Sequence, residues 1–307
     1  MALRSSSPGT SPRRPVRLVT LDSREVGGRP GICLPSGEIL DLAAAPRGLT
    51  AAQWRPQSVV SVLAEGDEGT ARVARLVAEA AAASDAQRQQ WRADGRLLPG
   101  SGTRLMTPIR RPGLLLMVSD DMGSRTACYV KNPNSTIGPD ASVPMPEGED
   151  PHLYLLAMVG VVIGRSLFRA TQAQAARAIA ALTLVADLGT RRLDRGPGDG
   201  CADARQFPGA CVLGPALVTT DEFPASESWV VSVGVNGRPV WAGHSDLGAQ
   251  RASTLLAGLS SRYAFRPGDV VGMPVGIPEF ELPSASHVTL ALGSTLELRF
   301  ATGVTAG

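Results

Sequence analysis

An apolar run lies near the middle of the chain, at residues 152–165 ("HLYLLAMVGVVIGR"). It contains no acidic residue, and Val159, Val161 and Val162 are among its β-branched side chains. A short run of this kind, closed by Gly164 and Arg165, predicts a strand that is buried on both faces. We therefore expect this strand at the centre of a sheet.

The hydrophobic patterns on either side of this run divide the chain into two folded regions. Residues 1–15 are rich in Ser, Pro and Arg and predict a disordered tail. Residues 16–98 are expected to form a small N-terminal α/β domain, and residues 99–112, rich in Gly and Pro, a linker. The expected elements of this first region are strands near 16–21, 30–34 and 37–41 and helices near 57–65 and 69–95.

Residues 113–307 are richer in strand patterns. A helix capped by Thr171 is expected to lead into the apolar stretch that ends at Asp187. Asn236-Gly237 predicts a hairpin, because both turn positions favour a positive φ. The polar, Gly-rich segment 187–207 is either a lid or a disordered connector. The expected strands lie near 113–118, 127–131, 153–163, 211–219, 228–235, 238–242, 269–275 and 286–300.

Composition and charge narrow the class of protein. The 307 residues are 43% hydrophobic, enough for a substantial core. No apolar run approaches the roughly 18 residues that a membrane span needs. The net charge is only +2 and the basic residues are dispersed, which argues against a nucleic-acid partner. Cys33, Cys128, Cys201 and Cys211 form no CxxC pair and are expected to be reduced. We expect a cytoplasmic protein with a small-molecule partner.

Lys131, in "YVKNPNSTIGPD", is the only lysine among 30 basic residues. A chain that uses arginine everywhere else keeps one lysine here, which indicates a site that needs a compact ammonium group rather than a planar guanidinium.

Six segments follow one another in an order typical of one enzyme family. They are "KNPNSTIGP", "YLLAMVGVVIGR", "LVADLGTRR", "RQFPGACVLGPALVT", "VNGRPV" and "FRPGDVVGMPVGI". The series resembles the fumarylacetoacetate hydrolase (FAH) superfamily over about residues 16–300. The resemblance implies an α+β fold, with a small N-terminal α/β domain and a C-terminal domain of mixed β-sheets rolled into a β-sandwich or barrel-like core. It also implies a homodimer formed through the C-terminal domain.

The resemblance implies that the family's metal site is altered in this chain. With "VVIGR" as anchor, the two metal-binding glutamates of the family fall on Leu156 and Met158, and the preceding aspartate falls on Tyr154. The third ligand is retained as Asp187. Mg²⁺ and Ca²⁺ require oxygen ligands, which leucine and a thioether do not supply. We therefore expect no metal cofactor, and Mg²⁺ only if its ligands are rearranged.

The acid–base residues of the family are altered as well. Its catalytic lysine aligns with Arg205, which cannot act as a base. The threonine that contacts a substrate carboxylate in the family aligns with Met273. The lid histidine and glutamate are missing from "VSDDMGSRTA", which leaves Asp120 and Asp121. We expect these acids on a loop after the strand "GLLLMVS", as solvated residues, pocket acids or ligands of a rearranged metal site.

Four charged residues are the candidate catalytic groups. Asp187 ends an apolar strand, so its charge needs compensation, and Arg191 and Arg205 are the expected partners. Asp187 is either half of an ion pair that replaces the metal or a general base with an arginine as electrostatic partner. Lys131 matches the lysine of the family's "KPP" segment. It is either solvated, a cavity cation that stabilises an enolate or a carboxylate, or a Schiff-base residue.

The candidate substrate-binding residues surround these groups. Tyr154 either projects a phenol into the space of the lost metal or is a core tyrosine, and His244 is the histidine in the most plausible pocket segment. The full set is Asp120, Asp121, Tyr154, Leu156, Met158, Met273 and His244.

Three functional hypotheses remain open. The first is a metal-independent FAH-fold enzyme that isomerises, cyclises or decarboxylates a small 1,3-dicarbonyl or enol substrate through an enolate, with the apolar replacements favouring a polyketide-like compound of specialised metabolism. The second is a non-catalytic binding protein that kept the fold. The third is a divalent-metal-dependent C–C bond hydrolase with rearranged ligands.

Overall fold

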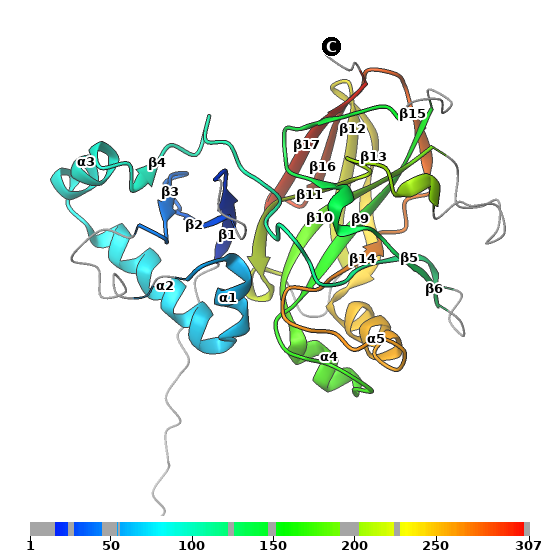
Figure 1. The fold of residues 1–307 in the computed structure, drawn as a ribbon, viewed down its shortest axis with the longest axis horizontal. Helices are drawn as coiled ribbons and strands as arrows, with labels where there is room; N and C mark the ends of the chain where they lie inside the picture. Colours follow the sequence, from blue (N-terminus) through cyan, green and yellow to red (C-terminus); the bar gives the residue numbers. More distant parts are fainter. Residues whose placement is uncertain are drawn as a thin grey trace, which may run out of the picture.

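A long mixed sheet, a smaller antiparallel-rich sheet and flanking helices make up the computed structural model (Figure 1). The structure describes residues 16–23, 28–44, 54, 56–121, 126–146, 152–190, 203–223 and 228–303. The predicted tail 1–15 and Arg191 lie outside these residues. The predicted α+β class is confirmed.

The long sheet contains most of the strands. Its order is β4-β3-β2-β1-β11-β10-β9-β14-β5-β6, with β15 paired to β9 and β7 paired to β11. Its strands are β1 (Arg17–Leu21), β2 (Arg29–Cys33), β3 (Ile39–Asp41), β4 (Leu97–Leu98), β5 (Leu115–Asp121), β6 (Thr126–Val130), β7 (Thr136–Ile137), β9 (Leu153–Ile163), β10 (Ile179–Gly189), β11 (Cys211–Thr219), β14 (Val270–Pro274) and β15 (Phe280–Leu282).

The second sheet covers one face of the first. Its order is β13-β12-β16-β17-β8, from strands β8 (Ser142–Val143), β12 (Ser228–Val235), β13 (Arg238–Gly248), β16 (His287–Leu292) and β17 (Leu296–Thr302). The helices are α1 (Val59–Ala64), α2 (Asp67–Ala82), α3 (Asp85–Ala93), α4 (Gln172–Ala178) and α5 (Ala249–Leu259), with 3₁₀ turns η2 (Pro133–Ser135), η4 (Asp203–Arg205) and η5 (Thr220–Glu222).

The long sheet is open, which corrects the expectation of a barrel-like core. Its path runs from β4 to β6, and the described strands form no pairing that joins these two ends. The two sheets instead pack face to face, with β10 and β11 against β16 and β17. The sandwich part of the prediction therefore describes the core, and barrel closure does not.

The sheet also runs without interruption from the predicted N-terminal domain into the C-terminal one. β1 pairs antiparallel with β11, where Arg17 lies opposite Val218 and Leu18 opposite Leu217. In Figure 1 the N-terminal helices and strands lie together at one end of this sheet. The boundary at residues 99–112 stays a prediction, but hydrogen bonds join its two sides in one sheet.

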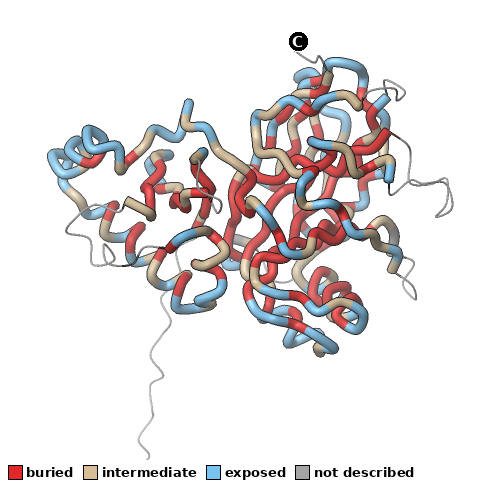
Figure 2. The backbone as a smooth tube through the Cα atoms, viewed as in Figure 1, coloured by how far each residue is buried: buried red, intermediate tan, exposed pale blue. Residues whose placement is uncertain are grey.

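The apolar run of residues 152–165 forms β9, the strand predicted to be central. β9 lies between β10 and β14, and every one of its side chains except Tyr154 is buried. Its odd-numbered side chains pack into the core between the two sheets, whereas Leu156, Met158 and Val162 pack on the other face. Figure 2 shows this buried centre, with exposed residues restricted to the periphery. The run is apolar throughout because both faces of the strand are covered.

Local signals explain where several predicted elements end. The expected helix 69–95 is two helices, because Ala83 is extended and Ser84 caps α3 in a capping box with Gln87. Thr171 caps α4 as predicted, but that helix ends after Ala178, where β10 begins its pairing with β9. Tertiary pairing therefore overrides the helical propensity of the alanines that follow.

Three further elements can be compared with the prediction: two hairpins and one helix. The hairpin at Asn236-Gly237 is confirmed, with φ of 52° and 74° at these residues. The single strand expected over 286–300 is the hairpin β16–β17, which turns at Gly293 with φ 56°. α5 was not predicted, although its buried Ala252, Leu256 and Leu259 follow helical spacing. The described helices include none that is long and apolar enough to cross a membrane.

Candidate active site

One face of the long sheet positions the candidate site. Leu156 lies directly opposite Asp187 on β10, and Asp187 lies opposite Cys211 on β11, so these three side chains share one face. Met158 is two residues along β9 and belongs to the same face. The positions predicted to replace the metal ligands therefore lie beside Asp187.

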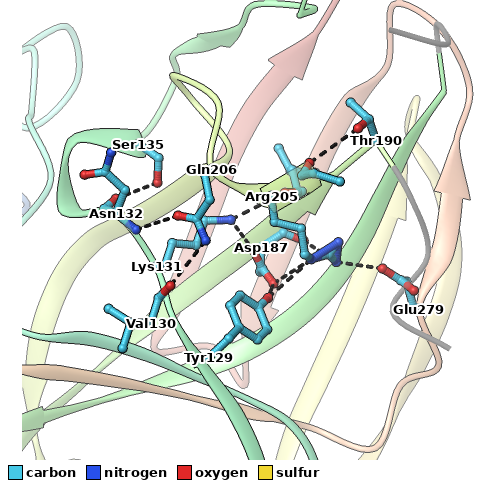
Figure 3. Close-up of polar contacts among 12 residues, drawn as sticks. Tyr129, Val130, Lys131, Asn132, Ser135, Asp187, Thr190, Arg205, Gln206 and Glu279 are labelled. Carbon is cyan, nitrogen blue, oxygen red and sulfur yellow. Dashed lines mark hydrogen bonds and ion pairs between the residues drawn. The ribbon is translucent and has the colours of Figure 1, made fainter. Parts of the chain in front are cut away.

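The Asp187 carboxylate is fully buried and is surrounded by hydrogen-bond donors (Figure 3). Lys131 donates from Nζ to Oδ1, and the Tyr129 hydroxyl donates to Oδ2. Arg205 donates from Nε to Oδ2 at 3.1 Å. A buried carboxylate with two cationic partners avoids the cost of an uncompensated charge.

Lys131 is also fully buried, so the solvated alternative for this residue is wrong. Its backbone N–H donates to the carbonyl of Leu115 at 2.8 Å. Gln206 holds both neighbours of Lys131, because its Oε1 accepts from the N–H of Asn132 at 2.7 Å and its Nε2 donates to the carbonyl of Val130 at 3.2 Å. The segment that carries the only lysine is thus fixed against the segment that carries Arg205.

Arg205 joins Asp187 to a second acid. It ends the short turn η4, and its Nη2 donates to Oε1 of Glu279 at 2.6 Å. The guanidinium packs over Gly189, where a β-carbon would collide with it. The side chain of Arg205 is fully buried and that of Glu279 is 8% exposed. Lys131, Arg205, Asp187 and Glu279 together form an electrically neutral cluster.

Burial and charge set the protonation of two neighbours of Asp187. Burial, followed by the negative charge of Asp187, holds the pKa of the Tyr129 phenol well above its usual value. Tyr129 therefore stays protonated and acts as a donor. Burial raises the pKa of the Cys211 thiol to about 12, which leaves it protonated and unreactive at neutral pH.

The donor set around Asp187 does not fit the divalent metal of the family. Both carboxylate oxygens already accept from Lys131, Arg205 or Tyr129. Leu156 and Met158 offer no oxygen, and the other nearby acid, Glu279, is bound to Arg205. Over the described ranges, no cluster of three or more His, Cys, Asp or Glu side chains could hold a metal ion. Lys131 instead provides the positive charge next to Asp187.

Several predicted site residues lie elsewhere. Met273 lies opposite Val159 and packs into the core between the sheets, so its side chain is on the face away from Asp187. His244 is exposed on β13 in the second sheet, where its Nδ1 contacts Oγ of Ser228 at 3.2 Å. Both predictions are therefore corrected. Alternation of side chains along β14 turns Met273 to the other face, and His244 belongs to a different sheet; the order of the motifs shows neither.

The structure also corrects the expected backbone conformation of Asp120 and Asp121. They belong to β5 rather than to a loop, and they pair with Ala127 and Thr126 of β6. Tyr154 lies opposite Gly189 and is partly exposed on the face of the sheet that carries Asp187. Of the predicted catalytic residues that the structure describes, Asp187, Lys131 and Arg205 lie together in one cluster.

Tyr129 and Glu279 complete the cluster and were not predicted from the sequence. Tyr129 directly precedes "VKNPN", two residues before Lys131, and Glu279 lies in "PVGIPEFEL" after the last matched segment. Its place beside the matched segment that carries Lys131 was the available signal for Tyr129. Glu279 gave no signal, because the segment beyond "MPVGI" matched no pattern.

The cluster is closed to solvent in this structure. The side chains of Lys131, Asp187 and Arg205 have no exposed surface. A cavity of about 280 Å³ lies at a different place, between α2 and the beginning of β10, where Thr70 and Ile179 are among its lining residues. Two members of the cluster, Tyr129 and Glu279, are partly exposed, and so is Tyr154 on the same face of the sheet.

Comparisons with known proteins find similarity over most of this chain. Residues 117–306 match the family model "Fumarylacetoacetate (FAA) hydrolase C-terminal". "Oxaloacetate tautomerase Fahd2a, mitochondrial" of Rattus norvegicus is 26% identical over 290 residues, which cover 89% of this chain and 85% of that protein.

Solved structures share the fold at lower identity. The fumarylacetoacetate hydrolase of Exiguobacterium antarcticum superposes with a TM-score of 0.72 at 17% identity, over 94% of this chain and 100% of that one. The maleylpyruvate hydrolase of Sphingobium sp. SYK-6, solved with manganese(II) and pyruvate, gives a TM-score of 0.63 at 18% identity, over 94% of this chain and 98% of that one.

Proposed function

Since this chain belongs to the fumarylacetoacetate hydrolase family, we propose that it is an isomerase of the tautomerase type. Its substrate is a small 2-oxo acid or 1,3-dicarbonyl compound, and the reaction passes through an enolate without a divalent ion. One observation carries the proposal: the Asp187 carboxylate lies on the site face with Lys131, Arg205 and Tyr129 as its donors. The name of the rat relative supports the reaction class.

The cluster contains the groups that this reaction needs. Asp187 removes a proton from the carbon next to a carbonyl, and the resulting negative charge on oxygen is stabilised by the ammonium of Lys131 and the guanidinium of Arg205. Tyr129 donates a hydrogen bond, or its proton, to the same oxygen. Return of a proton to a different atom completes an isomerisation, which consumes no co-reactant.

The surroundings of the cluster define the substrate more closely. Leu156 and Met158 place apolar surface beside Asp187, which favours a more apolar enol than a simple 2-oxo acid, such as a polyketide-like compound. Access requires movement of the partly exposed Tyr129 and Glu279. The cytoplasmic location and the homodimer stay predictions.

The test is the enol-to-keto conversion of oxaloacetate, followed by ultraviolet absorbance with the full chain. We expect acceleration that chelator leaves unchanged and that falls by a factor of about 100 or more in Asp187→Asn or Lys131→Met. The matched control is Arg299→Met, which removes a cation from an exposed ion pair with Glu297 and should keep full activity. Loss of activity with chelator and recovery with Mg²⁺ would instead support the metal-dependent hypothesis, with Asp120 or Asp121 as added ligands.

A non-catalytic binding protein is the second candidate, and complete burial of Lys131, Asp187 and Arg205 favours it. In that case the ion pairs would only stabilise the fold. Absence of turnover on oxaloacetate and on a panel of apolar 1,3-dicarbonyl compounds, with Lys131→Met affecting stability alone, would decide for this candidate.

A further inference from the structure

Arg205 contacts two carboxylates that differ in their surroundings. Its Nε contacts Asp187, which is fully buried on the strand β10. Its Nη2 contacts Glu279, which is slightly exposed and lies just before β15, in the connection from β14. Figure 3 shows Glu279 reaching the guanidinium from the side opposite to Lys131.

From this arrangement we infer that Glu279 occupies a subsite for the carboxylate of a ligand, and that an anionic ligand exchanges with Glu279 on Arg205. The inference rests on the proposed function and adds to it the position, on Arg205, at which a carboxylate group of the ligand would bind.

The charge balance of the cluster supports an exchange of this kind. Lys131 and Arg205 carry two positive charges, and Asp187 and Glu279 carry two negative ones, all within a single network of contacts. Departure of Glu279 alone would leave a buried guanidinium with incomplete compensation, which is costly. A ligand carboxylate restores the balance and offers the planar geometry to which a guanidinium binds well. A neutral ligand does neither.

The connection from β14 to β15 is built to let Glu279 leave. Glu279 lies outside the strands, unlike Asp187, so its departure breaks no strand pairing. Gly276, which lies against Asp246 of β13, adopts φ 80° within this connection. A glycine in this conformation allows local changes of backbone direction that other residues resist. Tyr154 and Tyr129 are the partly exposed side chains that a ligand would meet on the same face.

The experiment measures equilibrium binding by calorimetry, with malonate as the carboxylate probe and malonamide as its neutral counterpart. In Glu279→Gln the competing charge is gone, and we expect malonate to bind about tenfold more tightly than to the natural chain, a change of ~1.4 kcal/mol. Malonamide binding should not change. Adding Arg205→Met to Glu279→Gln should abolish the gain.

Glu281→Gln is the matched control, because Glu281 lies two residues further on, contacts His152 and is 47% exposed. An equal gain of malonate affinity in this variant, or no gain in Glu279→Gln, would overturn the inference. Glu279→Asp keeps the negative charge but shortens the side chain by one methylene, which moves the carboxylate away from Arg205. We expect this second, milder variant to bind malonate a few-fold more tightly than the natural chain. No gain in that variant would also count against the exchange.

The binding measurement is independent of turnover. A gain of malonate affinity in a chain that converts no oxaloacetate would keep the carboxylate subsite and reject the proposed reaction. Turnover of oxaloacetate without any gain in Glu279→Gln would keep the reaction and reject the subsite.

Discussion

At the scale of single residues, the site depends on how the buried charge of Asp187 is compensated. Lys131 and Arg205 both contact its carboxylate, and none of the three side chains has exposed surface. Removal of one member of such a group leaves another charge buried without its partner, which is far more damaging than loss of a surface ion pair.

We therefore predict that Lys131→Met lowers the free energy of unfolding by about 3 to 5 kcal/mol. The measurement is urea unfolding followed by fluorescence. Arg299→Met, at an exposed ion pair, should leave the free energy of unfolding nearly unchanged. The double variant Lys131→Met with Asp187→Leu removes both charges, so it should recover much of the loss. If the two substitutions simply added, the ion pair would not be the cause.

At the scale of elements, the end of β10 determines where the guanidinium of Arg205 lies. Gly189 is the last residue of this strand, and Arg205 fills the space that a side chain there would take. The strand therefore ends in a glycine for reasons of packing, and the site geometry depends on it.

We predict that Gly189→Ala displaces Arg205, lowers the free energy of unfolding by about 1 to 3 kcal/mol and reduces oxaloacetate conversion. Urea unfolding and the absorbance assay measure the two effects. Gly258→Ala is the matched control, since Gly258 lies in α5 with no atom near the position of an added β-carbon. There alanine should stabilise the helix by about 0.5 to 1 kcal/mol. Full activity and stability in Gly189→Ala would show that Arg205 does not need this space.

At the scale of the whole molecule, the pairing of β1 with β11 makes both halves of the chain part of one sheet. The segment after the N-terminal helices also runs along β1, where Met106 N–H donates to the carbonyl of Thr20 at 2.9 Å and the Thr20 hydroxyl donates to the carbonyl of Pro108 at 2.7 Å. When one half unfolds, the other half therefore loses this strand pairing and these hydrogen bonds.

We predict that the full chain unfolds in a single transition. Tryptophans report on both halves, with Trp54 and Trp91 in the N-terminal part and Trp229 and Trp241 in the C-terminal part. Urea curves from Trp fluorescence and from far-ultraviolet circular dichroism should coincide. Two separated transitions would show that the regions fold independently despite their shared sheet.

The sequence by itself determined the fold class and the central strand β9. These followed from local signals, namely an apolar β-branched run, capping residues and ordered motifs, which act over a few residues. Lys131, Asp187 and Arg205 were also recognisable, because each stands in a matched segment.

Only the tertiary structure decided which of the candidates meet. It turned Met273 toward the inter-sheet core, placed His244 on the second sheet and brought Tyr129 and Glu279 to Arg205 and Asp187. Residues 129, 187, 205 and 279 are far apart in the chain, and their contacts depend on strand order and register. Register and order result from long-range packing, which no local pattern in the sequence contains.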